Sequence, residues 1–514
     1  MNQKEELFKS IWKIAEKLRG KVDGWDFKSY ILCILFFRYI SEDITKCLNK
    51  NESSDFNYAN LNDNEVPEDV IIETIKEKGF FIKPSQLFVN VVKNAKNNKD
   101  DLNINITNIF RDIENSSKGY ESERNLKGIF YDIDFNSPNL GSSAPERNKH
   151  LYEILTNIAE IKLDLKDSDN DIFGDAYEYL MGMYASNAGK SGGEYFTPQE
   201  VSKLLTKLAI GNKKEIKNVY DPACGSGSLL LQAAKILGDE NVTQGYYGQE
   251  SNITTYNLCR MNMFLHNINC SNFDIELGDT LIDPKHALDN KYEVIVSNPP
   301  YSIKWEGDDN PTLINDVRYA PAGILAPKSK SDYAFIMHAL YLLATNGKAA
   351  IVCFPGIFYR GGAEQKIRQY LVNNNYIDLI INLPDNLFYG TSISTCIMVL
   401  NKSKLNHENN IMFIDATREF EKRTNQNILS EDNINKILNT YLERKEIDHF
   451  SKIVELDTIK ENDYNLSVSN YIEQENNKEV IDINVLNSDI DRIVKRNDEL
   501  RTKINEIIKE LNHK

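Results

Sequence analysis

Short apolar runs alternate with amphipathic segments through the middle of the chain, from about residue 195 to residue 401. The runs have the length of buried strands, and the segments between them repeat apolar residues at helical spacing. This alternation predicts a doubly wound, mostly parallel α/β sheet, which binds ligands at the carboxyl ends of its strands. We expect strands near residues 217–220, 245–249, 275–277, 292–297, 348–354, 376–383 and 396–400, with helices at 228–237, 254–266, 331–343 and 364–373.

The regions on either side of this alternation have a different pattern. Residues 7–184 are predicted to be mostly helical, with helical apolar spacing at 7–18, 27–40, 151–161 and 171–185, and the chain after Asn401 is polar and also predicted to be helical. A chain of 514 residues is too long for one ordinary domain. We expect a helical N-terminal domain (1–170), the sheet domain (171–402), a C-terminal extension (403–479) and a long terminal helix (480–514).

The terminal helix carries a seam with a spacing of four and three residues. The seam consists of Leu486, Ile490, Ile493, Asn497, Leu500, Ile504, Ile507 and Leu511. This is a coiled-coil-like pattern with one polar residue at an a-type position. It favours a handle for another chain, in which Asn497 fixes the register; a helix folded onto its own domain is the alternative.

The cysteine pattern and the net charge indicate the cell compartment and the kind of partner. Seven scattered cysteines without a Cys-x-x-Cys pair indicate a reducing cytoplasm and no zinc or other metal site. We find no signal peptide, and the longest apolar run, residues 30–37, is too short to span a bilayer. The net charge of −16 repels phosphate, so we expect that any DNA substrate is held by a basic partner or by a local basic groove.

A glycine turn follows the first predicted strand. Residues 221–228, Asp-Pro-Ala-Cys-Gly-Ser-Gly-Ser, end that strand and begin a helix. Gly225 and Gly227 allow a tight turn that brings the backbone close to a ligand. The third glycine of the dinucleotide fingerprint and the P-loop lysine are both absent, which excludes hydride-transfer and P-loop sites. A plain strand–helix connection is the alternative.

Two acidic residues follow the next two strands. Glu250 ends the second strand, where a carboxylate can accept hydrogen bonds from both ribose hydroxyls of a nucleoside. Asp279 follows the third strand and can accept a bond from the adenine amine of the same cofactor. A helix-capping acid and an ordinary turn residue are the respective alternatives.

The fourth strand ends in Asn298-Pro299-Pro300-Tyr301. Two successive prolines end the strand and stiffen the loop. The Asn298 amide oxygen and the Pro299 carbonyl can then accept both hydrogens of a planar amine, which makes its nitrogen nucleophilic toward a sulfonium methyl without a general base or a metal. Tyr301 offers a face on which a flipped base can stack.

This set of segments resembles an amino-group DNA methyltransferase of the Rossmann-like class I type. The segment from Gly193 to Gln199 resembles the motif that closes over the methionine end of S-adenosylmethionine. Together with the helical N-terminus, the segment 464–472 and the coiled-coil-like tail, it makes the whole chain resemble the modification subunit of type I restriction–modification systems. The resemblance implies a cofactor site that comprises Glu194, Tyr195, Phe196, Thr197, Pro198, Gln199, Asp221, Gly225, Ser226, Gly227, Ser228, Glu250 and Asp279.

The resemblance also implies partners. A specificity subunit, engaged by the C-terminal helix, would choose the site on double-stranded DNA, two copies of this chain would serve each specificity subunit, and a restriction subunit would complete the complex. The family's later segments match residues 331–335 and 383–388, which would line the target-base pocket; a helix face and a capped turn are the alternatives. Adenine is expected over cytosine because cytosine-N4 enzymes of this kind usually carry serine at the position of Asn298.

Alternative functions remain at this stage. Enzymes that methylate protein glutamine or RNA guanine also use Asn-Pro-Pro-Tyr, and a cofactor-binding scaffold without activity is a third possibility. Residues 304–330, rich in Gly, Pro and Asp, are predicted to be either a mobile flap over the flipped base or an ordinary surface loop.

Overall fold

The computed structural model describes Phe8 and residues 26–50, 52–53, 55–97, 100–161, 172–187, 196–389, 392–404, 408–423, 426–473 and 483–512. The chain divides into two compact units, Met1–Ile472 and Glu473–Lys514.

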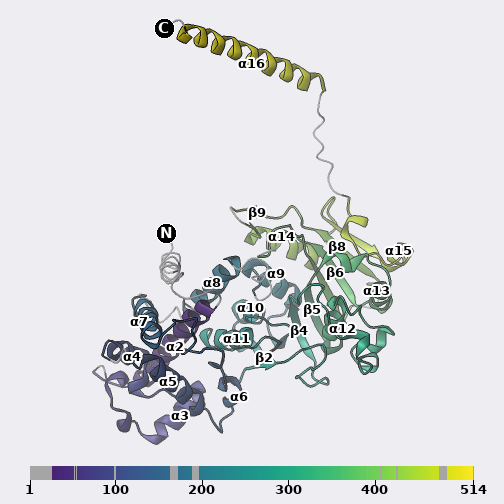
Figure 1. The fold of residues 1–514 in the computed structure, drawn as a ribbon. Coiled ribbons are helices and arrows are strands. Elements are labelled where there is room, and N and C mark those ends of the chain that lie inside the picture. Colours follow the sequence, from purple (N-terminus) through teal and green to yellow (C-terminus); the bar gives the residue numbers. More distant parts are fainter. Residues whose placement is uncertain are drawn as a thin grey trace. The chain divides into compact units, whose positions relative to one another are not determined.

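Among the described residues, a nine-stranded sheet of order β11-β8-β6-β7-β5-β4-β1-β2-β3 forms the centre of the first unit (Figure 1). β7 is antiparallel to β5 and β6, β11 is antiparallel to β8, and the other neighbours are parallel. The predicted doubly wound, mostly parallel sheet is therefore confirmed. Its strands are β1 (Ile216–Asp221), β2 (Val242–Glu250), β3 (Phe273–Leu277), β4 (Tyr292–Ser297), β5 (Leu343–Cys353), β6 (Ile377–Asn382), β7 (Cys396–Asn401), β8 (Asn410–Asp415) and β11 (Ser451–Glu455).

Helices cover both faces of this sheet. In β4, Val294 and Val296 belong to one apolar core and Ile295 belongs to the other, which explains why the strand is apolar along its whole length. One core includes α9 (Gln199–Ile210), α10 (Ser228–Leu237), α11 (Ile253–Leu265) and α14 (Glu431–Leu442). The other includes α12 (Asp332–Leu342), α13 (Ala363–Asn373) and α15 (Leu456–Glu461).

The prediction of a polar, helical region after Asn401 is wrong for two segments. β8 extends the main sheet beside β6, and β11 adds to its edge, so the sheet continues past the expected boundary at residue 402. The apolar run of β8 is as long as those of the predicted strands, but it lies between polar segments that hide it. A separate two-stranded sheet pairs β9 (Glu421–Lys422) with β10 (Asn427–Ile428).

The N-terminal region is helical, as predicted. The expected helices at 27–40, 151–161 and 171–185 are present as α2 (Asp26–Asn49), α7 (Ala144–Ala159) and α8 (Ile172–Asn187). The expected helix at 7–18 lies outside the described residues except for Phe8. The remaining helices of this region are α3 (Glu68–Lys78), α4 (Phe88–Ala95), α5 (Leu102–Ser116) and α6 (Glu123–Leu126).

Arg260 joins the N-terminal helices to the sheet domain. It lies on α11 and is 1% exposed. Its guanidinium donates to the carbonyls of Asn125 at 3.2 Å and Lys127 at 3.0 Å, and to Asn257 Oδ1 at 2.5 Å. Tyr256 stacks against the same guanidinium, 4.1 Å from its ring centroid. The two regions therefore share a buried polar contact as well as an apolar core.

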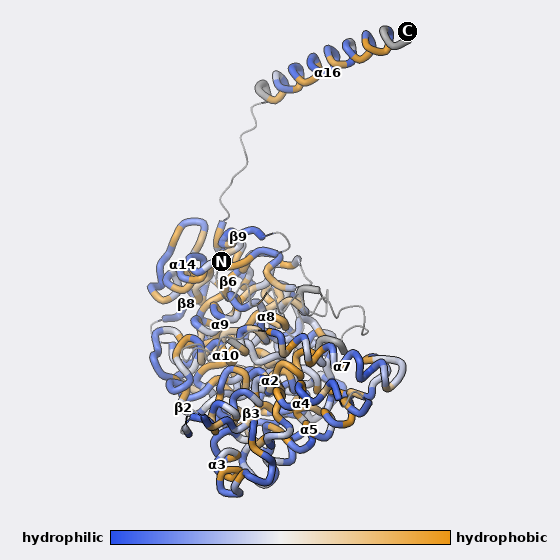
Figure 2. Tube along the Cα trace, turned by 90° about the vertical axis from the view of Figure 1, so that its left-hand side faces the viewer, coloured by the Kyte–Doolittle hydropathy of each residue, from blue (hydrophilic) through white to orange (hydrophobic). Residues whose placement is uncertain are grey.

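The second unit contains the predicted terminal helix, α16 (Ile483–Asn512). Apolar and polar residues alternate regularly along it (Figure 2). The apolar seam residues from Leu486 to Ile507 are 43% to 58% exposed. Within the described ranges, no helix has both the length and the apolar composition required to cross a membrane.

Replacing Arg260 with methionine should lower the free energy of unfolding by about 3 kcal/mol, because the buried carbonyl of Asn125 and the partly buried carbonyl of Lys127 lose their donor. Denaturant unfolding measures the loss. Arg124→Met is the matched control, since Arg124 is half exposed and makes one ion pair at 3.6 Å with Asp274; it should cost less than about 0.5 kcal/mol. Equal losses in the two variants would contradict the role assigned to Arg260.

Candidate active site

The strand order reverses between β1 and β4, and the loops that follow these two strands lie next to each other there. β1 pairs with β2 on one side and with β4 on the other, all parallel, so their carboxyl ends lie at one edge of the sheet. A reversal of this kind leaves an open crevice beyond the strand ends. The glycine turn after β1 and the Asn298–Tyr301 segment after β4 form the two sides of this crevice.

The glycine turn needs glycine for steric reasons. Gly225 has φ 54° and Gly227 has φ 80°, both in the left-handed region. A Cβ atom on Gly227 would lie 2.8 Å from Cys259 Sγ. The backbone N–H of Gly225 donates to Glu250 Oε2 at 3.1 Å, and the N–H of Asn252 donates to Glu250 Oε1 at 2.8 Å. These bonds fix the predicted ribose-binding carboxylate against the turn.

Asp221 lies beneath this turn and is fully buried. Its Oδ1 accepts from the Ala223 N–H at 3.0 Å and from Ser297 Oγ at 2.9 Å. Its Oδ2 has no hydrogen-bond partner among the described residues. Burial, with a smaller contribution from the charge of Glu250, raises the pKa of Asp221 to about 7, although its two hydrogen bonds oppose the shift.

Asn298 is held at both ends of its side-chain amide. Its Nδ2 donates to Thr197 Oγ1 at 3.1 Å, and its Oδ1 accepts from the Tyr301 hydroxyl at 2.5 Å. Burial raises the pKa of Tyr301 well above its usual value, so the hydroxyl stays protonated and donates. The amide is therefore fixed in one plane.

The segment at the start of α12 supports the loop that contains Asn298. Ser302 follows Tyr301 with φ 50°, and its N–H donates to both carboxylate oxygens of Asp332, at 3.2 and 3.1 Å. The N–H of Ser331 donates to the Ile303 carbonyl at 3.0 Å. Residues 332–335 thus form the first turn of α12 under the loop, and Phe335 also faces the cavity described next.

A cavity of about 950 Å³ occupies the crevice. Six predicted site residues line it: Glu250, Asp279, Asn298, Pro299, Pro300 and Tyr301. Pro222 and Ala223 of the glycine turn line it as well, whereas Asp221, Gly225 to Ser228 and Phe196 to Gln199 lie behind its wall. Glu194 and Tyr195 lie outside the described residues.

Two of the predicted cofactor residues behind the wall bond to each other. Gln199 Nε2 donates to Ser228 Oγ at 3.3 Å, and Gln199 Oε1 accepts from Gln232 at 2.6 Å. These contacts connect the start of α9 to α10. Their side chains therefore brace the glycine turn from its far side.

Two family models match the chain. An N-6 DNA Methylase model matches residues 168–480, and an HsdM N-terminal domain model matches residues 7–158. The methylase subunit of a type I restriction enzyme from Mycoplasma pneumoniae is 51% identical over 99% of this chain and 97% of its own length. The chain belongs to the N-6 DNA methylase family.

Other relatives agree with this N-6 DNA methylase assignment. A type I methylase subunit from Methanocaldococcus jannaschii is 30% identical over 95% of this chain and 82% of its own length. The crystal structure of a type I methyltransferase subunit from Streptococcus thermophilus matches with a TM-score of 0.82 and 35% identity, over 92% of this chain and 100% of that one. The predicted family, its adenine-specific DNA methyltransferase class and the methyltransferase fold are therefore confirmed.

Sequence analysis missed one wall of the methylase cavity. Ser29 and Tyr30 of α2, the segment that contains Asp132 and Asp134, and Tyr184 of α8 all face it. The Tyr30 hydroxyl donates to the Asp134 carbonyl at 2.7 Å, which holds the segment against α2. No motif marks these residues, since they come from the helical region and reach the site only through tertiary packing. Trp305, Phe388 and Tyr389 add aromatic surface, and Phe388 lies in the predicted segment 383–388.

Residues 304–330 line the cavity at one end and are anchored to the sheet domain further along. Lys304 and Trp305 line the cavity. Further along, Arg318 is 1% exposed and donates to the carbonyls of Thr280 at 2.7 Å and Leu281 at 2.8 Å. Those two residues directly follow Asp279. The middle of the segment is therefore anchored to the predicted adenine-binding turn.

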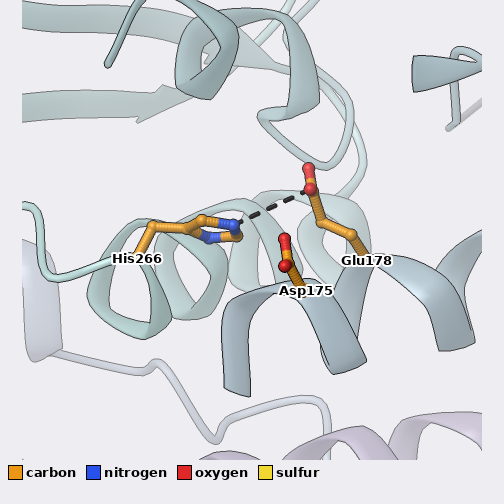
Figure 3. A group of neighbouring side chains, drawn as sticks. All are labelled: Asp175, Glu178 and His266. Atoms are coloured by element: carbon orange, nitrogen blue, oxygen red, sulfur yellow. Dashed lines mark ion pairs between the residues drawn. The ribbon is translucent and has the colours of Figure 1, made fainter. Parts of the chain in front are cut away.

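Asp175, Glu178 and His266 place three potential metal-ligand atoms within 4.8 Å of one another (Figure 3). Lys235 Nζ lies 2.5 Å from Glu178 Oε2 and 3.6 Å from Asp175 Oδ1. Glu178 Oε1 also accepts from Ser228 Oγ at 3.0 Å. Since the Lys235 ammonium already pairs with both carboxylates, we interpret this cluster as an ion-pair network that ties α8 to α10.

The buried carboxyl of Asp221 should make stability depend on pH. Its pKa of about 7 exceeds that of an unfolded aspartate, so the folded protein binds this proton more tightly. Stability is therefore lost as the pH rises from 5 to 8, by about 2 kcal/mol relative to Asp221→Asn. Denaturant unfolding of both proteins without cofactor, at several pH values, measures the difference. Parallel pH profiles would contradict the assignment.

Proposed function

We propose that this chain transfers a methyl group from S-adenosylmethionine to N6 of an adenine flipped out of double-stranded DNA. The observation that carries the proposal is that Asn298, Pro299, Pro300 and Tyr301 line the same cavity as Glu250 and Asp279. An amine-binding loop and a nucleoside-binding pair of carboxylates thus face one space. A cofactor-binding scaffold would need only the second of these.

The residues of the cavity fit S-adenosylmethionine. Glu250 is fixed by Gly225 where it can accept from ribose hydroxyls, and Asp279 lines the same cavity, where it would accept from the adenine amine. Residues 194–196, 198–199 and 225–228 would complete the site. The bound cofactor would supply an electrophilic sulfonium methyl.

The chain's own residues would position the target amine. In this mechanism Asn298 Oδ1 and the Pro299 carbonyl accept its two hydrogens, so electron density stays on nitrogen. Tyr301 stacks on the base, and Phe388 and Tyr389 supply further aromatic surface in the same cavity. Flipping is required because the reacting atom is inaccessible within the duplex.

The partner proposal rests on charge and on α16. The chain as a whole carries a net charge of −16, which disfavours gripping DNA alone. The seam of α16 is exposed, and the positions that flank its middle are Val494 and the cations Arg496, Arg501 and Lys503. A second copy of the same helix in parallel would oppose Arg496 with Arg501. We therefore assign the seam to a specificity subunit, with two copies of this chain per specificity subunit and a restriction subunit in the full complex.

Asn298→Ala should abolish methyl transfer by the assembled complex, with a loss of at least about 1,000-fold, because the amine loses its acceptor. Cofactor affinity should stay within about twofold, since Glu250 and Asp279 are untouched. Transfer of radiolabelled methyl to DNA measures the rate, and calorimetry measures cofactor binding. Asn439→Ala, an exposed change on α14, is the matched control. If wild type transfers no methyl to DNA with its partner, the enzyme proposal fails.

Truncation after Glu479 should abolish assembly with the specificity subunit and leave cofactor binding intact, because α16 belongs to a separate compact unit. Co-purification of the two chains tests assembly. Full-length Asn497→Leu should still assemble, since it removes only the polar position of the seam. If the truncated chain still assembles, the proposal that α16 binds the specificity subunit is wrong.

A further inference from the structure

Thr197 contacts the proposed catalytic amide rather than the cavity. It lies two residues before α9 and is 7% exposed. Its Oγ1 accepts from Asn298 Nδ2 at 3.1 Å across a sequence separation of 101 residues. It does not line the cavity, although the motif around it predicts a cofactor contact.

An asparagine amide needs such a contact to work as an acceptor. Its last torsion is broad and roughly twofold, and its two ends have nearly the same size. Only the oxygen end can accept from an amine. In the structure Thr197 Oγ1 accepts a hydrogen bond from Asn298 Nδ2, and the Tyr301 hydroxyl donates to Asn298 Oδ1. The second lone pair of Oδ1 is left for the target amine.

Thr197 is itself held firmly on both sides. The ring of Phe196 lies 6.0 Å from the ring of Tyr389, and a Cβ atom on Gly182 of α8 would lie 3.3 Å from Phe196 Cε1. On the other side, Pro198 leads into α9, whose first residue Gln199 bonds to Gln232. The hydroxyl therefore has little freedom to follow a rotating amide.

We propose that Thr197 is a positioning residue that fixes the side-chain amide of Asn298 with its oxygen toward the target amine. The inference rests on the proposed function, in which Asn298 binds that amine. It reassigns Thr197 from a cofactor contact to the amine-accepting site. It also links the segment that the resemblance places over the cofactor to the loop that holds the base.

Thr197→Val removes the hydroxyl and preserves the shape of the side chain. In the complex with the specificity subunit, kcat for methyl transfer should fall by about 10- to 100-fold, because a misplaced acceptor loses that much. The dissociation constant of S-adenosylmethionine should stay within about twofold. Thr197→Ser, which keeps the hydroxyl, should restore kcat to within about threefold of wild type. Thr206→Val is the matched control, because it removes a buried hydroxyl of α9 that bonds to Ser202 instead.

A second measurement separates positioning from a loss of packing. Hypoxanthine carries a carbonyl where adenine carries its amine. This carbonyl can only accept, so it pairs with Asn298 when the side-chain amide presents its nitrogen instead of its oxygen. Duplexes with adenine or hypoxanthine at the mapped target position should differ in affinity for wild type, and Thr197→Val should reduce that preference for adenine at least about threefold.

The outcomes are distinguishable. Wild-type complex without methyl transfer would overturn the proposed function itself. Active wild type together with an unchanged kcat or an unchanged adenine preference in Thr197→Val would overturn only the positioning role. A weakened cofactor affinity with unchanged kcat would return Thr197 to the cofactor site.

Discussion

The hydrogen bond from Ser297 Oγ to Asp221 Oδ1, 2.9 Å long and fully buried, joins the two halves of the active site. Asp221 ends β1 and Ser297 ends β4; between them the chain forms β2 and β3 on one side of β1 and then returns to its other side as β4. The bond holds the glycine turn and the Asn298 loop side by side at the carboxyl ends of the strands. The remaining site depends on this, since Glu250 is fixed by the turn and Asn298 by the loop. β1 and β4 are parallel neighbours, so their carboxyl ends lie side by side and the two side chains reach hydrogen-bond distance.

The helical N-terminal region is part of the site as well as a neighbour of it. α2 and the segment around Asp132 form one wall of the cavity, and Arg260 fixes that region to α11. The wall brings carboxylates and hydroxyls, and the cavity also contains Glu250 and Asp279, so its lining disfavours phosphate groups and suits a nucleoside with a positively charged sulfonium and amino group. Negative charge at the site and over the whole chain agrees with a division of labour in which another subunit contacts the DNA phosphates.

Much of this could be predicted from sequence because local patterns determine it. The strands from β1 to β7, the glycine turn, Glu250 and the Asn298–Tyr301 loop all follow from apolar runs and from glycine and proline positions. β8 and β11 were missed because the apolar run of β8 lies between polar segments and because β11 is half exposed at the sheet edge. Thr197, Asp132 and Arg318 could not be assigned from pattern alone, since their contacts join segments far apart in the chain. The motif around Thr197 marked it as a site residue, but its hydrogen bond with Asn298 could be seen only in the structure.

The central claim is that this site delivers a methyl group to the exocyclic amine of adenine in DNA. The most direct test is to express the chain with its specificity partner in cells that lack other DNA methylases, and to digest the genomic DNA for nucleoside mass spectrometry. We expect N6-methyladenine at a defined sequence and no gain in methylated cytosine. Methylation on cytosine, or methylation found on protein glutamine or RNA guanine with none on DNA, would contradict it.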